Sequence, residues 1–403
     1  MNLFVKLLSN GILVQFLTII STLIFSRLFS VDQFGSLAFY VSFGSLIAVV
    51  GGLRFDYLIL KENISEKLAG YFISNIISIL MNLLIMLIAY IFQSKFDFLS
   101  DVNIFILFIF GLGFSLFNNL SQYLISKKNY KLFTRLRLIQ VIGVFFIALF
   151  MKFLFNSSNS MVYAYSLSQL CLGMGGMLFI VKTYNKSIKN EHPHVFLKKN
   201  FHESFQNFTI SFMQYSTPLM PVLIGGYIFD QKNIGAYFVF SQMISAPLNI
   251  FRRNLLIFFN GEFASKQKFN DVIKAKILTQ RNLLLFTFSL TFISTILYFL
   301  KNEVVAILLG TQWLPYSYLL LPLFIYFLFD CILQPFTTLL PLWGNANYSL
   351  TMEFFRFFLL IIILPLSTIY LKIEFFEFLM AYIIIMLTIY YIVVFKTLQL
   401  SKV

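Results

Sequence analysis

The chain has 403 residues, of which 59% are hydrophobic and only 11% are charged, and its mean hydropathy is +0.84. Soluble globular domains carry about 25% charged residues, so this composition excludes a soluble domain and predicts a polytopic membrane protein. The net charge of +14 is explained by Lys and Arg residues that flank the apolar runs, which indicates contact with anionic membrane lipids and gives no reason to expect nucleic acid.

The first apolar run follows Lys6 and continues to about Phe29 without a small-residue cleavage site behind it, so we expect a transmembrane helix here and no removable signal. A helix needs roughly 20 apolar residues to cross a hydrocarbon core of ~30 Å. By this measure the chain is an all-α membrane protein with about twelve transmembrane helices. The predicted spans are about 7–29, 35–57, 69–92, 103–125, 134–155, 161–182, 208–229, 234–258, 282–300, 315–340, 353–371 and 377–396.

The distribution of Lys and Arg residues predicts the orientation of these spans. Of the 30 basic residues, 24 fall on the side of the membrane that holds both ends of the chain, and six fall on the other side. Positive residues concentrate in cytoplasmic segments. We therefore expect both termini in the cytoplasm, and we expect the bacterial cytoplasmic (inner) membrane as the location. The outer residues are Arg27, Lys95, Lys152, Lys232, Lys301 and Lys372.

The longest polar connection, residues 183–207, falls after the sixth predicted span. It predicts an N-terminal six-helix bundle over residues 1–182, a cytoplasmic linker, and a C-terminal six-helix bundle over residues 208–403. Residues 30–60 also align with residues 229–259 when Gly35 is placed on Gly235. Both copies run inward from the outer side, so we expect a parallel pseudo-repeat, as in transporters built from two bundles.

Three segments resemble one known family. "SRLFSVDQFGSLAFY" followed by "LRFDYLIL" (residues 26–60) is similar to the first and second helices of the polysaccharide flippases, the O-antigen and capsule-repeat translocases. "IGAYFVFSQMISAPLNIFRRNLLIFFNGEFAS" (234–265) resembles their seventh-to-eighth helix region, and "ILLGTQWLPYSYLLLPLFIYF" (307–327) their tryptophan-containing hairpin. This family belongs to the superfamily that includes multidrug-and-toxin extruders and the lipid II flippase.

The resemblance implies a transporter that is not an enzyme. It would flip an undecaprenyl-pyrophosphate-linked oligosaccharide, for O-antigen of lipopolysaccharide or a similar surface polysaccharide, from the cytoplasmic to the outer leaflet by alternating access. It implies no cofactor, leaves a proton or sodium gradient open as the energy source, and suggests a polysaccharide polymerase and a chain-length regulator as partners. The alternatives are a multidrug or cation extruder of the same superfamily and a membrane polymerase or glycosyltransferase.

Basic residues near the cytoplasmic ends of spans are candidates for contact with the pyrophosphate. An arginine can bind a phosphate group through paired hydrogen bonds, whereas the same residue can also be an ordinary flank that reaches the lipid head groups. Lys128, Lys131 and Arg135 are spaced three and four apart, so we expect one helical face. The candidate pyrophosphate-binding residues are Arg54, Lys131, Arg135 and Arg253.

Two charged pairs lie near the ends of the second predicted span. Arg54 and Asp56 are about 200° apart on a helix, so we expect them to face different partners. Arg27, at the outer end of the first span, is expected to cap a helix or to pair with Asp32, with cargo contact as the alternative.

Asp330 lies near the middle of the tenth predicted span. An unpaired carboxylate there costs at least about 2.5 kcal/mol, so it should face water, take up a proton or form an ion pair. The sequence leaves two roles open for Asp330: ion coupling, and a structural pair with Arg356. Glu353 lies three residues before Arg356 and could satisfy that arginine instead.

Amide side chains recur within the spans, where interhelical hydrogen bonds are their usual role. Asn118 and Gln122, four residues apart, are the candidates for sugar contact. No phosphate-binding loop is present, the two Cys residues cannot form a zinc site alone, and all three His residues lie in the predicted linker. We therefore predict no catalytic residues and no metal site.

Overall fold

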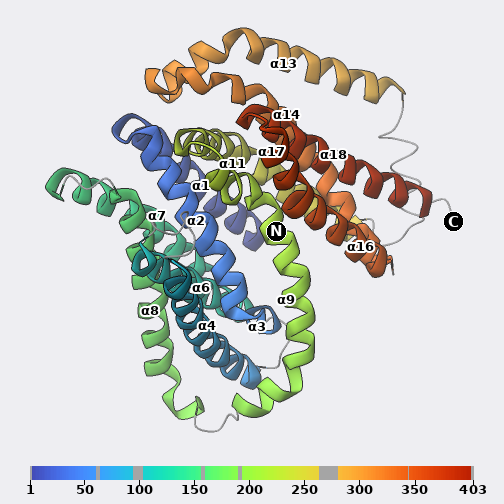
Figure 1. The fold of residues 1–403 in the computed structure, drawn as a ribbon. Coiled ribbons are helices and arrows are strands. Elements are labelled where there is room, and N and C mark those ends of the chain that lie inside the picture. The colour runs from blue at the N-terminus through green and yellow to red at the C-terminus, as the bar shows by residue number, and fades with distance from the viewer. Residues whose placement is uncertain are drawn as a thin grey trace. The chain divides into compact units, whose positions relative to one another are not determined.

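The computed structural model describes residues 2–59, 64–93, 103–155, 159–188, 193–262, 280–343 and 345–400, and every regular element in these ranges is helical (Figure 1). The chain divides into two compact units. Unit 1 comprises residues 1–18 and 35–227, and unit 2 comprises residues 19–34 and 228–403. This boundary differs from the linker expected at 183–207, because the helix that follows the linker belongs to unit 1. The division into two six-helix bundles stays a prediction.

Unit 1 is built on long apolar helices whose lengths match membrane spans. Within the described residues its helices are α1 (Asn2–Leu28) and α2 (Val31–Gly52), each in part, followed by α3 (Phe55–Leu58), α4 (Ile64–Phe92), α6 (Ile104–Ser126), α7 (Tyr130–Phe155), α8 (Ser160–Ile188), α9 (Pro193–Leu223) and the start of α10 (Gly225–Ile228).

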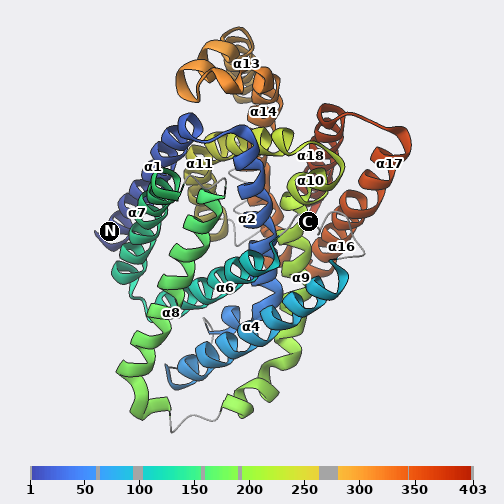
Figure 2. The same cartoon turned by 60° about the vertical axis from the view of Figure 1, so that its left-hand side comes forward.

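The centre of unit 1 is α6, which packs against α4 and α8 (Figure 2). Two glycines let α6 and α8 approach closely. A Cβ at Gly113 of α6 would lie 2.8 Å from the backbone nitrogen of Leu170, and a Cβ at Gly173 of α8 would lie 2.7 Å from Cβ of Leu116. Small residues at a helix crossing maximise van der Waals contact where lipid provides no hydrophobic driving force. This crossing therefore depends on the absence of two side chains.

Unit 2 is organised around α14 (Leu320–Thr337), which packs against both α11 (Gln231–Glu262) and α18 (Phe375–Leu400). The apolar sequence of α14 buries Leu320, Leu323, Tyr326 and Cys331 in these contacts. The remaining described elements are α13 (Gln280–Leu308), the 3₁₀ helix η2 (Thr311–Leu319), α15 (Leu339–Leu342), α16 (Ala346–Phe358), the π-helix η3 (Leu359–Ile363) and α17 (Leu364–Leu371).

The C-terminal end of α1 is fastened to η2 within unit 2. The fully buried indole of Trp313 donates a 2.8 Å hydrogen bond to the carbonyl of Ser26, and its ring packs edge-on against Phe34. Arg27 Nη2 donates to the carbonyl of Ile307 at 2.6 Å, in the last turn of α13. Carbonyls at a helix end lack intrahelical donors, so the expected capping role of Arg27 is confirmed, with α13 as the capped helix.

Prolines and one wide turn interrupt the helical hydrogen bonds. Pro218 and Pro221 lie inside α9, Pro247 lies inside α11 and Pro335 lies inside α14. In η3 the N–H of Leu364 bonds to the carbonyl of Leu359, five residues back. This π-turn comes directly before a proline at position 365, whose missing N–H would weaken a regular helix at this point.

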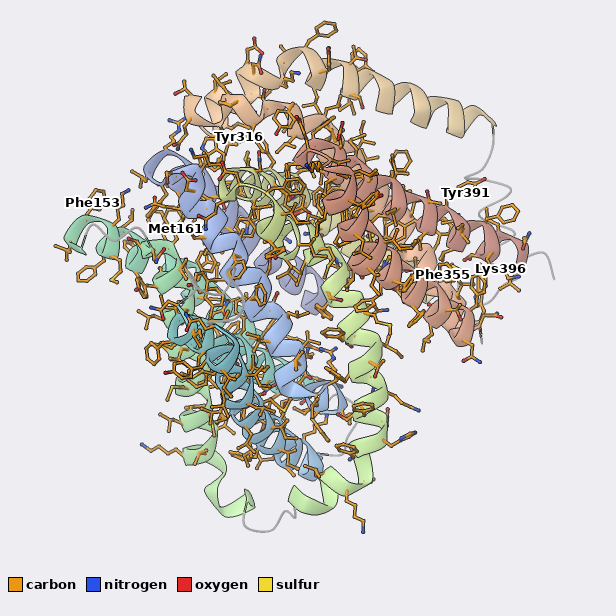
Figure 3. The ribbon with its side chains drawn as sticks, in the orientation of Figure 1. Phe153, Met161, Tyr316, Phe355, Tyr391 and Lys396 are labelled. Carbon is orange, nitrogen blue, oxygen red and sulfur yellow. The ribbon has the colours of Figure 1, made fainter. Side chains whose placement is uncertain are left out.

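Nine helices in the described part of the chain are long and apolar enough to cross a membrane, and α1 carries a shorter apolar segment, Leu13–Leu28. Expected spans on α9 and α13 are not among the nine, and α9 begins with a polar stretch that lowers its hydropathy. Exposed aromatic side chains such as Phe153 and Tyr391 (Figure 3) suit contact with lipid. The chain is thus a multi-pass membrane protein, while twelve spans and cytoplasmic termini stay predictions.

Candidate functional site

Arg54 lies where the second predicted span breaks. Helix α2 ends at Gly52, α3 begins at Phe55, and the two residues between them have positive φ angles, 41° for Leu53 and 60° for Arg54. The turn brings Arg54 Nη1 within 3.5 Å of Asp56 Oδ2. Our expectation that these residues face different partners is wrong, because it assumed a continuous helix across a segment whose backbone is left-handed.

Three elements surround the Arg54 side chain, which is 10% exposed. Asn118 of α6 donates from Nδ2 to Asp56 Oδ2 at 2.9 Å, so this carboxylate oxygen serves both the arginine and the amide. The ring of Tyr215 on α9 lies 5.6 Å from the Arg54 guanidinium carbon, a cation–π distance. We call Arg54, Asp56, Asn118 and Tyr215 the Arg54 cluster. It lies entirely within unit 1.

Buried amides connect α4 and α6 beside this cluster. Asn119 Nδ2 donates to Asn75 Oδ1 at 3.0 Å and to Ser78 Oγ at 3.2 Å, and Asn82 Nδ2 donates to Ser115 Oγ at 3.3 Å. A Cβ at Gly51 would lie 3.0 Å from Asn82 Nδ2, so a glycine leaves room for this contact. The usual role of intramembrane amides, interhelical hydrogen bonding, is confirmed for these residues.

The other candidate binding residues of unit 1 do not belong to the Arg54 cluster. Lys128 lies outside α7 with φ 57°, so the expected face of three cations is wrong for this residue. Lys131 and Arg135 are exposed on the first turns of α7, four residues apart. Gln122 is half-buried on α6, one turn after Asn118, and thus shares its face. Binding of pyrophosphate or sugar by these residues stays a prediction.

Asp330 lies in a second buried cluster, within unit 2. Arg252 Nη1 of α11 donates to Asp330 Oδ2 at 2.9 Å, and the hydroxyl of Tyr390 on α18 donates to Oδ1 at 2.7 Å. Both carboxylate oxygens of Asp330 therefore have a donor. The Asp330 side chain is 10% exposed and that of Arg252 is 32% exposed. We call Arg252, Asp330 and Tyr390 the Asp330 cluster; it joins three helices.

The pair with Arg356 that the sequence left open for Asp330 is wrong, and the alternative that Glu353 satisfies Arg356 is confirmed. Arg356 pairs with Glu353, one turn earlier on α16, and Asp330 pairs with Arg252. The i, i+3 spacing on one helix face brings Glu353 and Arg356 together locally, whereas Arg252 comes from a helix 78 positions away. The side chain of Arg253, the pyrophosphate candidate next to Arg252, lies outside the described residues.

The chemistry available differs between the two clusters. A guanidinium group can bind a phosphate through two parallel hydrogen bonds, and Arg54 presents such a group beside a carboxylate that an anionic ligand would have to share or displace. In the Asp330 cluster the arginine occupies the position of a cation at the carboxylate. Removing one partner from a buried ion pair is costly, so this cluster also fastens helices together.

Sequence reasoning missed Tyr215 and Tyr390. Their types and positions give no local signal, because tyrosine is frequent in this chain, with 21 copies. The contacts come from α9 and α18, far from Arg54 and Asp330 in the sequence. Only the tertiary arrangement identifies these two residues.

The fold is shared with known membrane transporters. Lipid II flippase MurJ, in an inward closed conformation, superposes with a TM-score of 0.65 and 16% identity over 99% of this chain and 88% of that chain. An inward-facing multidrug resistance MATE family transporter of the MOP superfamily gives a TM-score of 0.63 and 9% identity over 96% and 94%. At such low identity the likeness establishes the fold alone. No curated protein sequence matches the chain.

Sequence comparison defines the family. The model of a family described as polysaccharide biosynthesis protein matches residues 24–318, which is most of the chain and includes Arg54 and Arg252. The chain therefore belongs to the polysaccharide biosynthesis protein family, and it has the fold of MATE transporters and of the lipid II flippase.

Proposed function

We propose that this protein flips undecaprenyl-pyrophosphate-linked oligosaccharides, repeat units of O-antigen or a similar surface polysaccharide, from the cytoplasmic to the outer leaflet of the bacterial inner membrane. The observation that carries the proposal is the buried Arg54 at the break between α2 and α3, in a membrane protein of the polysaccharide biosynthesis family. A buried arginine in a membrane protein is expensive and indicates a functional site. The similarity of fold to a lipid II flippase supports a lipid-linked cargo.

In this proposal the pyrophosphate binds to the Arg54 guanidinium, with Lys131, Arg135 and Arg253 as further cations. Asp56 holds Arg54 in place until the anion arrives, because the two groups already form an ion pair at 3.5 Å. Tyr215 keeps the guanidinium plane oriented. Asn118 and Gln122, on one face of α6, contact the first sugar. The protein performs no covalent chemistry in this scheme; it binds and releases cargo.

Asp330 is proposed as the ion-coupling residue, with a proton as the ion. Protonation of its carboxyl group would weaken the 2.9 Å contact with Arg252 and so loosen α11 from α14. The competing role is purely structural, and the occupied oxygens of Asp330 are compatible with both. Transport by Asp330→Asn with and without a pH gradient decides between them: unaltered dependence on the gradient removes Asp330 from coupling.

The decisive experiment measures the leaflet in which lipid-linked repeat units reside, in vesicles that contain matched amounts of each variant. Wild type should deliver them to the outer leaflet. Arg54→Ala should slow delivery about tenfold or more, because hydrogen bonds to a charged group contribute roughly 1.5–3 kcal/mol and 1.4 kcal/mol is a factor of ten. Arg54→Lys should be intermediate, since it keeps the charge and loses paired recognition.

Arg137→Ala is the matched control. Arg137 is an exposed arginine on α7 that stacks on Phe117 and Phe133, so its removal deletes the same charge on the same predicted side of the membrane. Delivery by this variant should equal that of wild type. Sidedness that does not depend on the protein would refute the cargo, and extrusion of small cations would then be the function to test.

A further inference from the structure

A hollow of about 870 Å³ lies within unit 2, and no residue of the Asp330 cluster lines it. Its walls come from the N-terminal end of α11, from η2, and from the connection between α17 and α18, which can be followed in Figure 2. Pockets for small molecules measure about 300–1,000 Å³, so the hollow is large enough for a ligand. The residues that matter here are Phe229, Asn233, Tyr318, Lys372, Glu374 and Phe376.

The backbone fixes the rim of the hollow. Helix α17 ends at Leu371, and Lys372 follows with a φ of 52°, its N–H bonding to the carbonyl of Thr368. The N–H of Glu374 bonds to Glu377 Oε2 at 3.2 Å and so starts α18. A left-handed residue followed at once by a helix N-terminus is a defined turn with little freedom. It therefore holds the side chains of Lys372 and Glu374 two positions apart at the rim.

Aromatic rings form the walls. Tyr318 and Phe376 meet edge to face with ring centroids 5.6 Å apart, and Phe229 packs against the buried Phe375 at 5.4 Å. Tyr318 and Phe376 remain 37% and 38% exposed, so both rings are partly accessible to a ligand. Tyr316, labelled in Figure 3, lies two residues before Tyr318 on η2. Aromatic faces of this kind offer a flat apolar platform with a polar hydroxyl at its edge.

Four polar side chains surround these rings: the Asn233 amide, the Tyr318 hydroxyl, the Lys372 ammonium and the Glu374 carboxylate. Within the described residues none of them forms a hydrogen bond or an ion pair through its side chain. Together they supply several hydrogen-bond donors and acceptors, one of which is cationic and one anionic. A sugar fits this combination of aromatic rings and polar groups. A pyranose ring has apolar C–H faces that pack on an aromatic ring, and its hydroxyl groups both donate and accept hydrogen bonds.

We propose that this hollow is a carbohydrate-binding site that holds the glycan part of the cargo on the outer side of the membrane. The side follows from Lys232, Lys301 and Lys372, which belong to the few basic residues predicted there. The proposal rests on the proposed function for the identity of the glycan. A lipid head group fits less well, because the Glu374 carboxylate next to Lys372 repels a phosphate.

The test uses the intact protein in lipid nanodiscs and a water-soluble probe, the repeat-unit oligosaccharide of the source cell's own surface polysaccharide, freed of lipid by mild acid. Saturation-transfer NMR should show saturable binding to wild type. Tyr318→Ala removes the platform and Glu374→Gln removes a charged acceptor on an exposed side chain; each should weaken binding at least fivefold. Tyr370→Ala is the control, because Tyr370 is 88% exposed on α17 and does not line the hollow.

Equal binding by wild type, Tyr318→Ala and Glu374→Gln would overturn the proposal, and so would no binding to wild type. A head-group site would show the opposite charge response. Glycerol phosphate would displace the probe, and the binding of glycerol phosphate would be weaker in Lys372→Gln and stronger in Glu374→Gln. That result also overturns it. Arg54→Ala should keep full glycan binding while losing delivery across the membrane, so failure of the flippase function and failure of this site are separate outcomes.

Discussion

The Arg54–Asp56 pair of unit 1 and the Arg252–Asp330 pair of unit 2 are built in different ways. In unit 1, Arg54 and Asp56 are two residues apart and meet because the backbone between α2 and α3 turns through left-handed conformations. In unit 2, Arg252 and Asp330 lie in the middle of long helices, 78 positions apart, and Tyr390 of a third helix completes the contact.

Because of this difference, a different part of the structure depends on each pair. The unit 1 pair is local, so its loss leaves the packing of α6 on α4 and α8 in place, and the guanidinium can exchange its partner for a ligand. The unit 2 pair, together with Tyr390, is a polar link among α11, α14 and α18, so its loss affects the core of the unit. A local charge suits binding, and a bridging charge suits structure or a coupled movement of helices.

The largest expected effect comes from breaking the bridging pair. Asp330→Ala should destabilise unit 2 by about 3 kcal/mol, because it leaves Arg252 and Tyr390 without their acceptor. Reversible unfolding in mixed micelles measures the change, and both tryptophans, Trp313 and Trp343, report on unit 2.

A triple variant serves as the control for this experiment. Asp330→Leu combined with Arg252→Met and Tyr390→Phe replaces every polar member by an apolar side chain, and such replacements are often neutral or stabilising. Most of the lost stability should return. If the triple variant is as unstable as Asp330→Ala, the loss arises from packing and the bridging role is refuted.

In unit 1 a comparable effect should come from a single methyl group. Gly173→Ala places Cβ 2.7 Å from Leu116 Cβ and 3.0 Å from the backbone nitrogen of Phe117, so α6 and α8 must separate. We expect a loss of about 2 kcal/mol, measured by circular dichroism during unfolding in detergent. Gly175→Ala on the same helix meets nothing within 4 Å and should be neutral or slightly stabilising. Equal stability of the two variants would contradict the close crossing.

Two substitutions at each arginine test whether the backbone is left-handed at position 54 and helical at position 252. Arg54→Gly should be more stable than Arg54→Ala by roughly 0.5–1 kcal/mol, because only glycine adopts a φ of 60° without strain. Arg252→Gly should be less stable than Arg252→Ala by about 1 kcal/mol, because position 252 is inside α11. The same sign at both positions, measured in the same unfolding assay, would show that the two sites do not differ in this way.

The smallest effect concerns another left-handed residue of unit 1, which follows Leu53 and Arg54 in the sequence. Lys128 occupies the position after the C-cap of α6, where the N–H of Asn129 bonds to the carbonyl of Leu124 and the N–H of Lys128 to that of Ile125. Glycine is favoured at this position, so Lys128→Gly should raise the unfolding free energy by roughly 0.5 kcal/mol. Asn129→Gly, one residue further, is the control and should bring no gain.

The helical part of the fold was predictable because lipid imposes a simple rule on the sequence. A segment that crosses the hydrocarbon and satisfies its backbone hydrogen bonds within itself is an apolar helix, and each predicted span overlaps a helix of the structure. Sequence reasoning predicted neither the full length of α9 nor the π-turn η3. Helix α9 continues through residues that the polar composition marked as linker, and the π-turn before α17 leaves no compositional trace.

The candidate site was predictable in part, since a charge within an apolar run is conspicuous by itself. Arg54 and Asp330 were identified in this way, and their burial agrees with it. Their partners were not identified. The Arg54–Asp56 contact depends on two φ angles that a helical wheel cannot represent, and the choice of Arg252 over Arg356 depends on which helix packs against α14.

The π-turn at Leu359–Ile363 has a consequence for how this sequence can change in length. A π-turn is equivalent to one residue inserted into an α-helix, and the helix beyond it keeps the facing that it had before the insertion. Variants that lack one residue of this segment should therefore replace the π-turn by an α-helical turn, with Thr368 still buried.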